Sequence, residues 1–89
     1  MPKRERLEII KDILEVVKNN RAIKMTPLLR KSNLSSQRFV EYFKELSDKG
    51  FITESVDKHG KKVYFLSEKG FRYLEKYKTI MGFINELEL

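Results

Sequence analysis

One short β-hairpin in an otherwise helical sequence constrains the fold of this chain more than any other feature. Residues 51–56 and 61–66 are rich in β-branched and aromatic side chains, and residues 57–60 between them begin with Asp and end with Gly, as tight turns do. A two-stranded hairpin is marginally stable on its own in water. We therefore predict that it packs against the helices of the chain.

Apolar spacing and capping residues predict four helices around this hairpin. The expected helices cover residues 3–18, 27–31, 35–48 and 68–87. Thr26, Ser35 and Ser67 are the expected N-caps. Gly50 is expected to follow the third helix in the left-handed conformation. The second and third helices are joined by about three residues, which is typical of a helix-turn-helix.

Composition excludes several classes of protein. The 89 residues fit one small domain, and the absence of cysteine excludes disulfide scaffolds, thiol catalysis and Cys-ligated zinc. The single histidine, His59, argues against a multi-histidine metal site and a catalytic triad. No paired carboxylates lie in an apolar context, and no Gly-rich phosphate loop is present. We therefore expect no enzymatic activity, no metal and no cofactor, and no small-molecule ligand is evident.

Membrane insertion and export are not expected. The longest unbroken apolar run, residues 63–66, is far shorter than the roughly 20 residues that span a bilayer. The basic N-terminal residues are not followed by the apolar segment of a signal peptide. These features predict a cytoplasmic protein without a membrane partner.

The positive charge is concentrated in the middle of the chain. The net charge is +6, and no acidic residue lies between Glu15 and Glu41. That stretch holds six basic residues, equal to the whole net excess: Lys18, Arg21, Lys24, Arg30, Lys31 and Arg38. A second basic cluster lies in and beside the hairpin turn: Lys58, Lys61 and Lys62. Basic domains attract polyanions, so these residues are candidates for polyanion binding. The alternative interpretation is that they form only an ordinary solvated surface.

The order of elements predicts a mainly helical (α+β) winged helix-turn-helix domain, α-α-α-β-β-α. By position, helix 35–48 is the recognition helix, which we expect in the major groove of double-stranded DNA. The basic wing, residues 57–62, is expected on the DNA backbone or in the minor groove. Five phenylalanines are expected to point into the core rather than to stack on bases: Phe39, Phe43, Phe51, Phe65 and Phe71.

The candidate DNA-binding residues lie at the start and end of the second helix, on the third helix and on the wing: Lys24, Arg30, Lys31, Ser35, Ser36, Gln37, Arg38, Lys44, Lys58, Lys61 and Lys62. Gln37 is the best candidate to pair with adenine, and Ser36 suits a phosphate. Arg38 is expected to reach guanine or a phosphate, or only to cover the flank of its helix. Glu41 is expected to pair with Lys44 or Arg38, with a cytosine amino group as its alternative partner. With one long base-reading side chain, strong sequence specificity is not evident.

Two segments are similar to those of winged-helix proteins. Residues 46–52 (LSDKGFI) resemble the L-x-x-K-G-L-I segment where the recognition helix ends and the wing begins. Residues 64–70 (YFLSEKG) resemble the Y-x-L-T-x-K-G segment that closes the wing. With residues 6–14 and 33–35, nearly the whole chain resembles the archaeal 10a family of small basic winged-helix proteins. The resemblance implies a nucleoid-associated homodimer that pairs through its C-terminal helix and binds DNA with little sequence preference.

The last helix is expected to carry the dimer interface, because apolar side chains beyond its first two turns are typical of an association surface. We therefore divide the chain into a DNA-binding domain, residues 1–66, and a dimerisation helix, residues 67–89. The expected interface residues are Leu74, Tyr77, Ile80, Met81, Ile84 and Leu87. Gly82, inside this helix, either permits a close helix approach or shortens or kinks the helix.

The biological role is left open between two forms of DNA binding. One is a transcriptional regulator of a few operators, and the other is an architectural protein of chromatin. The alternative of a different class is a winged-helix module that binds other proteins and no DNA, because a fold does not fix a function.

Overall fold

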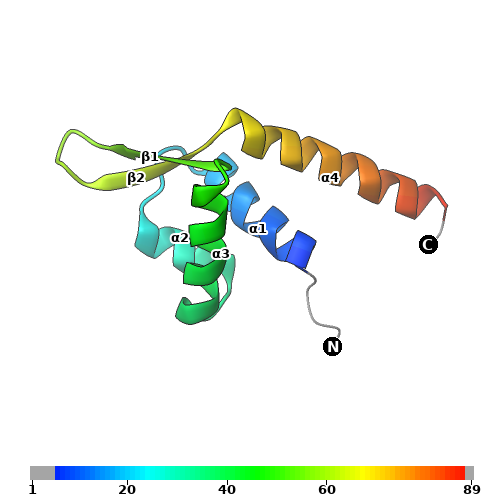
Figure 1. The fold of residues 1–89 in the computed structure, drawn as a ribbon, viewed down its shortest axis with the longest axis horizontal. Coiled ribbons are helices and arrows are strands. Elements are labelled where there is room, and N and C mark those ends of the chain that lie inside the picture. The colour runs from blue at the N-terminus through cyan, green and yellow to red at the C-terminus, as the bar shows by residue number, and fades with distance from the viewer. Residues whose placement is uncertain (1–5, 88–89) are drawn as a thin grey trace.

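The computed structural model describes residues 6–87 and confirms the predicted order of elements (Figure 1). The elements are α1 (Arg6–Asn19), α2 (Met25–Ser32), α3 (Ser36–Asp48), β1 (Ile52–Val56), β2 (Lys62–Leu66) and α4 (Glu68–Glu86). Residues 3–5 of the predicted first helix and residues 88–89 of the predicted dimerisation helix lie outside the described part. The winged helix-turn-helix topology predicted from the sequence is therefore correct.

The core forms around α1, whose inward side chains are fully covered. Ile9, Ile13 and Leu14 are at most 1% exposed. The other elements contribute further buried residues to the same cluster: Leu28 from α2, Phe39 and Leu46 from α3, Ile52 from β1 and Tyr64 from β2. The predicted packing of the hairpin against the helices is confirmed by this shared core.

The hairpin is also tied to the loop after α1 by backbone hydrogen bonds. Strands β1 and β2 pair antiparallel, with Ile52 opposite Leu66. The amide of Ile23 donates to the Tyr64 carbonyl at 3.2 Å, and the amide of Tyr64 donates to the Ile23 carbonyl at 2.8 Å. This extra bridge supports one edge of a hairpin that would be marginal alone.

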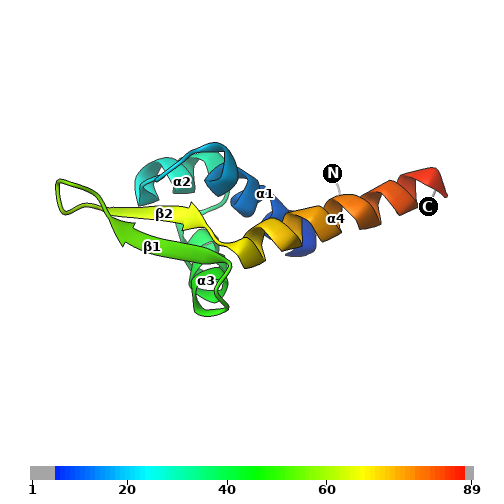
Figure 2. The ribbon, with the colours of Figure 1, turned by 90° about the horizontal axis from the view of Figure 1, so that it is seen from above.

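Helix α4 starts against the domain and then runs beyond it (Figures 1 and 2). Near its start, the Tyr73 hydroxyl donates to the Leu7 carbonyl of α1 at 2.9 Å. The molecule consequently measures 49 × 28 × 20 Å. Within residues 6–87, no helix combines the length and apolarity needed to cross a membrane.

The junction between the hairpin and α4 explains why the YFLSEKG segment has its sequence. The Ser67 hydroxyl oxygen accepts a hydrogen bond from the Gly70 amide at 3.0 Å, which confirms the predicted N-cap. The same hydroxyl lies 2.6 Å from the Gly50 carbonyl and 2.8 Å from the Phe51 carbonyl. The Lys69 ammonium lies 4.7 Å above the Phe51 ring. These contacts fix the start of α4 to the end of α3, where Gly50 has the predicted left-handed conformation with φ of 81°.

The predicted N-cap of the second helix is wrong. Helix α2 starts at Met25, with Lys24 in the N-cap position and no side-chain capping bond. The Lys24 carbonyl already accepts the Leu28 amide at 3.1 Å, so Thr26 lies inside the first turn. Pro27 is tolerated there because amides of the first turn have no partner within the helix.

The prediction that all five phenylalanines point inward is wrong for two of them. Phe65 is 39% exposed and Phe71 is 44% exposed. Successive strand residues point to opposite faces, and Tyr64 takes the core face, edge-on to Phe43 at 4.9 Å. Phe65 therefore points to the face opposite Tyr64, while on α4 Tyr73 and Leu74 pack against the core instead of Phe71.

Candidate nucleic-acid interface

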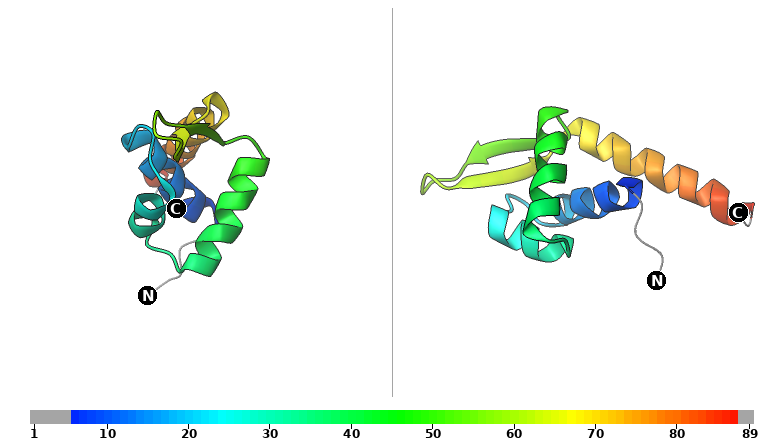
Figure 3. Two further views of the ribbon diagram at one scale, coloured as in Figure 1. Left: turned by 90° about the vertical axis from the view of Figure 1, so that its left-hand side faces the viewer. Right: turned by 60° about the horizontal axis from the view of Figure 1, so that its bottom comes forward.

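Helix α3 presents a continuous polar face to solvent. It stands on one side of the domain, with α1 and α2 on the other (Figure 3, left). Ser35 caps it by accepting the Arg38 amide at 3.3 Å, as predicted. Phe39 and Leu46, each 1% exposed, fix its rotation. The residues of its free face are all exposed: Ser36, Gln37, Val40, Glu41 and Lys44.

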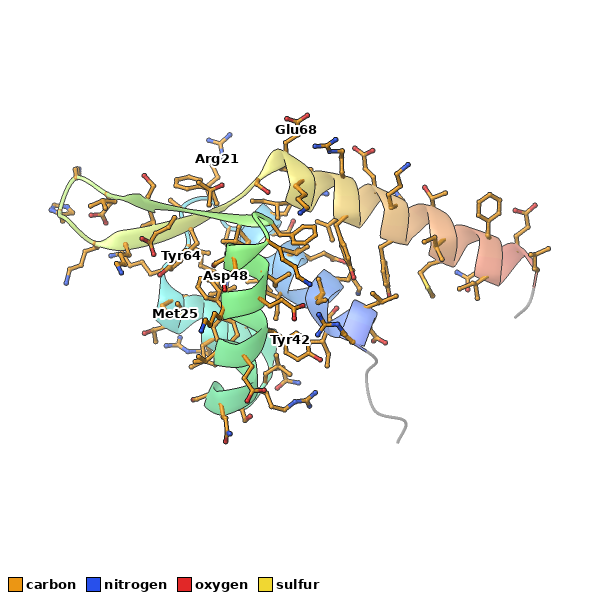
Figure 4. The ribbon with its side chains drawn as sticks, in the orientation of Figure 1. Arg21, Met25, Tyr42, Asp48, Tyr64 and Glu68 are labelled. Carbon is orange, nitrogen blue, oxygen red and sulfur yellow. The ribbon has the colours of Figure 1, made fainter. Side chains whose placement is uncertain are left out.

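Arg6 of α1 anchors α3 in this orientation. Its guanidinium forms an ion pair with Glu45 and lies 5.7 Å from the centre of the Tyr42 ring. Figure 4 shows Tyr42 between α3 and the start of α1. Sequence reasoning missed this role of Arg6, because 39 residues separate it from Glu45 and no local pattern joins them.

The exposed face of α3 is close to neutral in charge. The helix carries two basic residues, Arg38 and Lys44, and three acidic ones, Glu41, Glu45 and Asp48. Glu45 is neutralised by Arg6 and by Lys49, whose ammonium lies 3.7 Å away. The predicted ion pair of Glu41 is wrong: among residues 6–87 it pairs with neither Arg38 nor Lys44. Attraction for a polyanion therefore has to come mainly from elsewhere on the domain.

The wing carries three exposed lysines around a turn that Asp57 holds by hydrogen bonds. The Asp57 carboxylate accepts the amides of His59 at 2.8 Å and Lys61 at 2.9 Å. The hydrogen bond from the Lys61 amide is the main reason that the pKa of Asp57 lies below its ordinary value of 3.8, with the His59 amide and nearby Lys24 adding to the effect. The side chains of Lys58, Lys61 and Lys62 are all exposed around this turn.

Replacing Asp57 with Ala is expected to loosen the wing turn. The amides of His59 and Lys61 lose their acceptor, so their hydrogen exchange should become roughly tenfold faster. Because the pKa of Asp57 is lowered, the turn is fully stabilised above pH 3.8 and loses this support as the pH falls through the lower, folded-state value. NMR measurement of amide exchange and of the carboxyl titration checks both statements. Asp48→Ala removes an exposed carboxylate elsewhere and should leave both amides unchanged; equal exchange in the two variants would contradict this role of Asp57.

The structure brings the start of α2 to the wing. The Lys24 ammonium lies 3.9 Å from an Asp57 carboxylate oxygen, and the Lys62 ammonium lies 3.9 Å from Glu54. Both lysines are more than half exposed, and exposed ion pairs of this kind are worth little. The contact with Asp57 places Lys24 beside the wing, and we call the four exposed lysines Lys24, Lys58, Lys61 and Lys62 the wing cluster.

The other basic residues of the acid-free stretch do not join the wing cluster. Lys18 lines a groove between α1 and α4, and the Lys31 ammonium donates to the Asn20 side chain at 2.8 Å. Arg21 points away from α2 and α3, above the hairpin (Figure 4). Arg30 is exposed in the last turn of α2. Continuity in sequence therefore did not produce one continuous cationic surface.

An apolar surface lies at the opposite end of the molecule, on α4. A groove of about 540 Å³ separates α4 from α1 and includes Leu74, Tyr77 and Met81. Leu74 packs against the core of its own chain, and the Lys11 ammonium lies 5.7 Å from the centre of the Tyr77 ring. Further along the helix the side chains are less covered, with exposed fractions of 55% for Ile80, 59% for Phe83 and 64% for Leu87. Met81 and Ile84 are half-buried.

Comparison with known proteins places this architecture in a family. A family model described as winged helix-turn-helix matches residues 3–85. The fold is similar to that of Sso10a-2, a DNA-binding protein from Sulfolobus solfataricus, with a TM-score of 0.75, 19% identity, and coverage of 96% of this chain and 86% of that one. It is also similar to SSV1 F-93, with a TM-score of 0.70, 24% identity, and coverage of 99% and 94%.

A transcription regulator has the same fold. MepR, which regulates the Staphylococcus aureus multidrug efflux pump MepA, gives a TM-score of 0.76 at 14% identity over 89% of this chain and 60% of that one. No curated protein gives a significant sequence match. At these identities the likeness concerns the fold, and at that level it agrees with the resemblance to the archaeal 10a proteins.

Proposed function

Since the chain belongs to the winged helix-turn-helix family, we propose that it binds double-stranded DNA. The recognition helix α3 enters the major groove, and the wing lies on the backbone or in the minor groove. The observation that carries this proposal is the pairing of an exposed polar face on α3 with the wing cluster on the same end of the molecule, away from the free end of α4 (Figure 1).

The two surfaces have different tasks in this proposal. The nearly neutral α3 positions Gln37 for an adenine edge and Ser36 for a phosphate. The wing cluster supplies most of the electrostatic attraction, and Arg30, Arg38 and Lys44 add phosphate contacts at the edges. Lys31 donates a hydrogen bond to Asn20, so it contributes less to phosphate binding than the sequence alone predicts. Binding dominated by phosphates is tight but weakly selective.

The protein acts as a dimer through α4. Ile80, Phe83 and Leu87 are more than half exposed on a single chain, and a continuous apolar stripe of this kind is typical of an association surface. Ile84 and Met81 extend the stripe toward the groove beside α1. The resemblance of the sequence to the dimeric archaeal 10a proteins also supports pairing through α4. A dimer presents two recognition helices and two wings to one duplex.

An architectural role fits this charge distribution better than a regulator of a few operators. The face of α3 offers few base-reading donors, whereas the wing cluster binds any phosphate backbone. A module that binds only proteins is the second candidate function, and a near-neutral α3 face is the observation that favours it.

Salt dependence tests DNA binding directly. With about six phosphates contacted by each protomer, the slope of log K against log salt concentration should lie near −5. Changing Lys61 and Lys62 together to Ala should weaken binding to all sequences alike and make the slope less steep by about 2. Fluorescence anisotropy on a labelled duplex at several salt concentrations measures both.

A matched control for this experiment lies on α4. Arg72→Ala combined with Lys76→Ala removes the same number of exposed charges from α4, outside α3 and the wing cluster, and it should leave the slope unchanged. A flat salt response of the wild type, or no duplex binding at low salt, would favour the protein-binding module instead.

A further inference from the structure

Val40 stands at the centre of the exposed face of α3 and has no place in the core. It is 59% exposed, whereas the neighbouring Phe39 is 1% exposed. Gln37 and Lys44, which are three residues before it and four after it, lie on the same face of the helix and are exposed as well. The face expected to meet DNA thus has an apolar centre between an amide and an ammonium group.

Nothing in the folding of the domain requires valine at this position. A β-branched residue loses side-chain freedom in a helix, so Val is a poorer helix former than Ala, Leu or Lys. An exposed valine in the middle of α3 therefore weakens the helix slightly, and its side chain gains little stabilisation from burial. A contact made only in a complex would account for it.

The chemistry of the major groove offers one apolar partner. Thymine places a C5-methyl group there, beside the acceptor and donor of its paired adenine, and apolar side chains contact this methyl group. Cytosine lacks the methyl group at the same position, and phosphates offer no apolar surface. The exposed Val40 therefore matches the thymine methyl group, and the exposed Gln37 one turn away matches the donor and acceptor of adenine.

We infer that Val40 recognises the C5-methyl group of thymine in the major groove, next to a base pair whose adenine edge is taken by Gln37; this rests on the proposed binding of DNA through α3. The contact gives the domain a modest preference for A·T-containing sequences on top of its phosphate binding. Val40 is thus a specificity-determining residue, and the wing cluster is not.

Uracil in place of thymine tests the inference, because it removes the methyl group without changing charge or base pairing. Anisotropy titrations compare one A·T-containing duplex with the same duplex in which every thymine is replaced by uracil. Wild type is expected to bind the thymine duplex about fourfold more tightly for each methyl group it covers. Val40→Ala should bring this ratio close to one and leave the affinity for the uracil duplex unchanged.

Val56→Ala is the matched control, since Val56 is 61% exposed on β1, outside α3 and outside wing residues 57–62, and the substitution removes the same atoms. It should keep the wild-type ratio. Tight binding of wild type to both duplexes with a ratio near one would overturn the inference and leave the proposed function standing. A ratio that persists in Val40→Ala would overturn it too, because the methyl effect then arises elsewhere. No binding to either duplex at low salt would refute the proposed function together with the inference.

Discussion

Replacing Ile84 with Glu is expected to convert the proposed dimer to a monomer of 10.6 kDa. Ile84 is half-buried on α4, beside the exposed Ile80 and Leu87. A carboxylate there has no basic partner in the apolar stripe and is costly to bury in a helix pair. Loss of the second recognition helix and wing should lower the affinity for a long duplex about 100-fold. Sedimentation velocity and anisotropy titrations measure the two effects.

Thr79→Glu is the matched control, because it adds the same charge to the polar side of α4. Thr79 is exposed and its hydroxyl donates to the Glu75 carbonyl of its own helix. The Thr79 variant should remain a dimer. If Ile84→Glu sediments as wild type does, α4 is not the dimer interface and the apolar stripe requires another explanation.

Replacing Gly70 with Ala is expected to destabilise the fold strongly. A Cβ atom on residue 70 would lie 2.4 Å from Cδ1 of Leu66 and 2.6 Å from the Phe51 carbonyl oxygen. The leucine can turn, but the carbonyl belongs to the backbone at the junction of α3 and the wing, so α4 has to move. Overpacking of this kind costs about 1–3 kcal/mol, which lowers Tm by roughly 4–8 °C for each kcal/mol in a domain of this size. Calorimetry at fixed protein concentration measures the change.

Gly82 provides the opposite case in the same helix. An added Cβ meets nothing within 4 Å, and Ala is favoured over Gly inside a helix by about 0.5–1 kcal/mol. Gly82→Ala should therefore raise Tm slightly. Equal Tm values for the Gly70 and Gly82 variants would contradict the close approach at Gly70.

The fold was largely predictable because its signals are local. Ser35 and Ser67 cap their helices with hydrogen bonds that span three residues, and the hairpin turn is held by Asp57 within a four-residue loop. The prediction failed at Thr26, because the Lys24 carbonyl already accepts the first helical amide. It also failed at Phe65, because the neighbouring Tyr64 occupies the core face of the strand.

The candidate site was less predictable because it depends on distant contacts. Arg6 orients α3 through Glu45, and the Lys24 ammonium meets the wing at Asp57, yet neither pair is linked by any local spacing. Six basic residues in an acid-free stretch suggested one cationic surface. The structure separates them, since they are distributed over α1, α2, α3 and the loop between α1 and α2.

By itself, the sequence determined the elements, their order, the N-caps of α3 and α4 and the sign of the net charge, because the elements and caps depend on residues a few positions apart and the charge depends on composition alone. Only the tertiary structure decided which lysines lie together at the wing, why residue 70 has to be glycine, and that Arg6 neutralises Glu45 on α3. Those properties arise where segments tens of residues apart come into contact. In this domain, packing around α1 brings these distant segments together, and the periodicity of the sequence does not predict which of them meet.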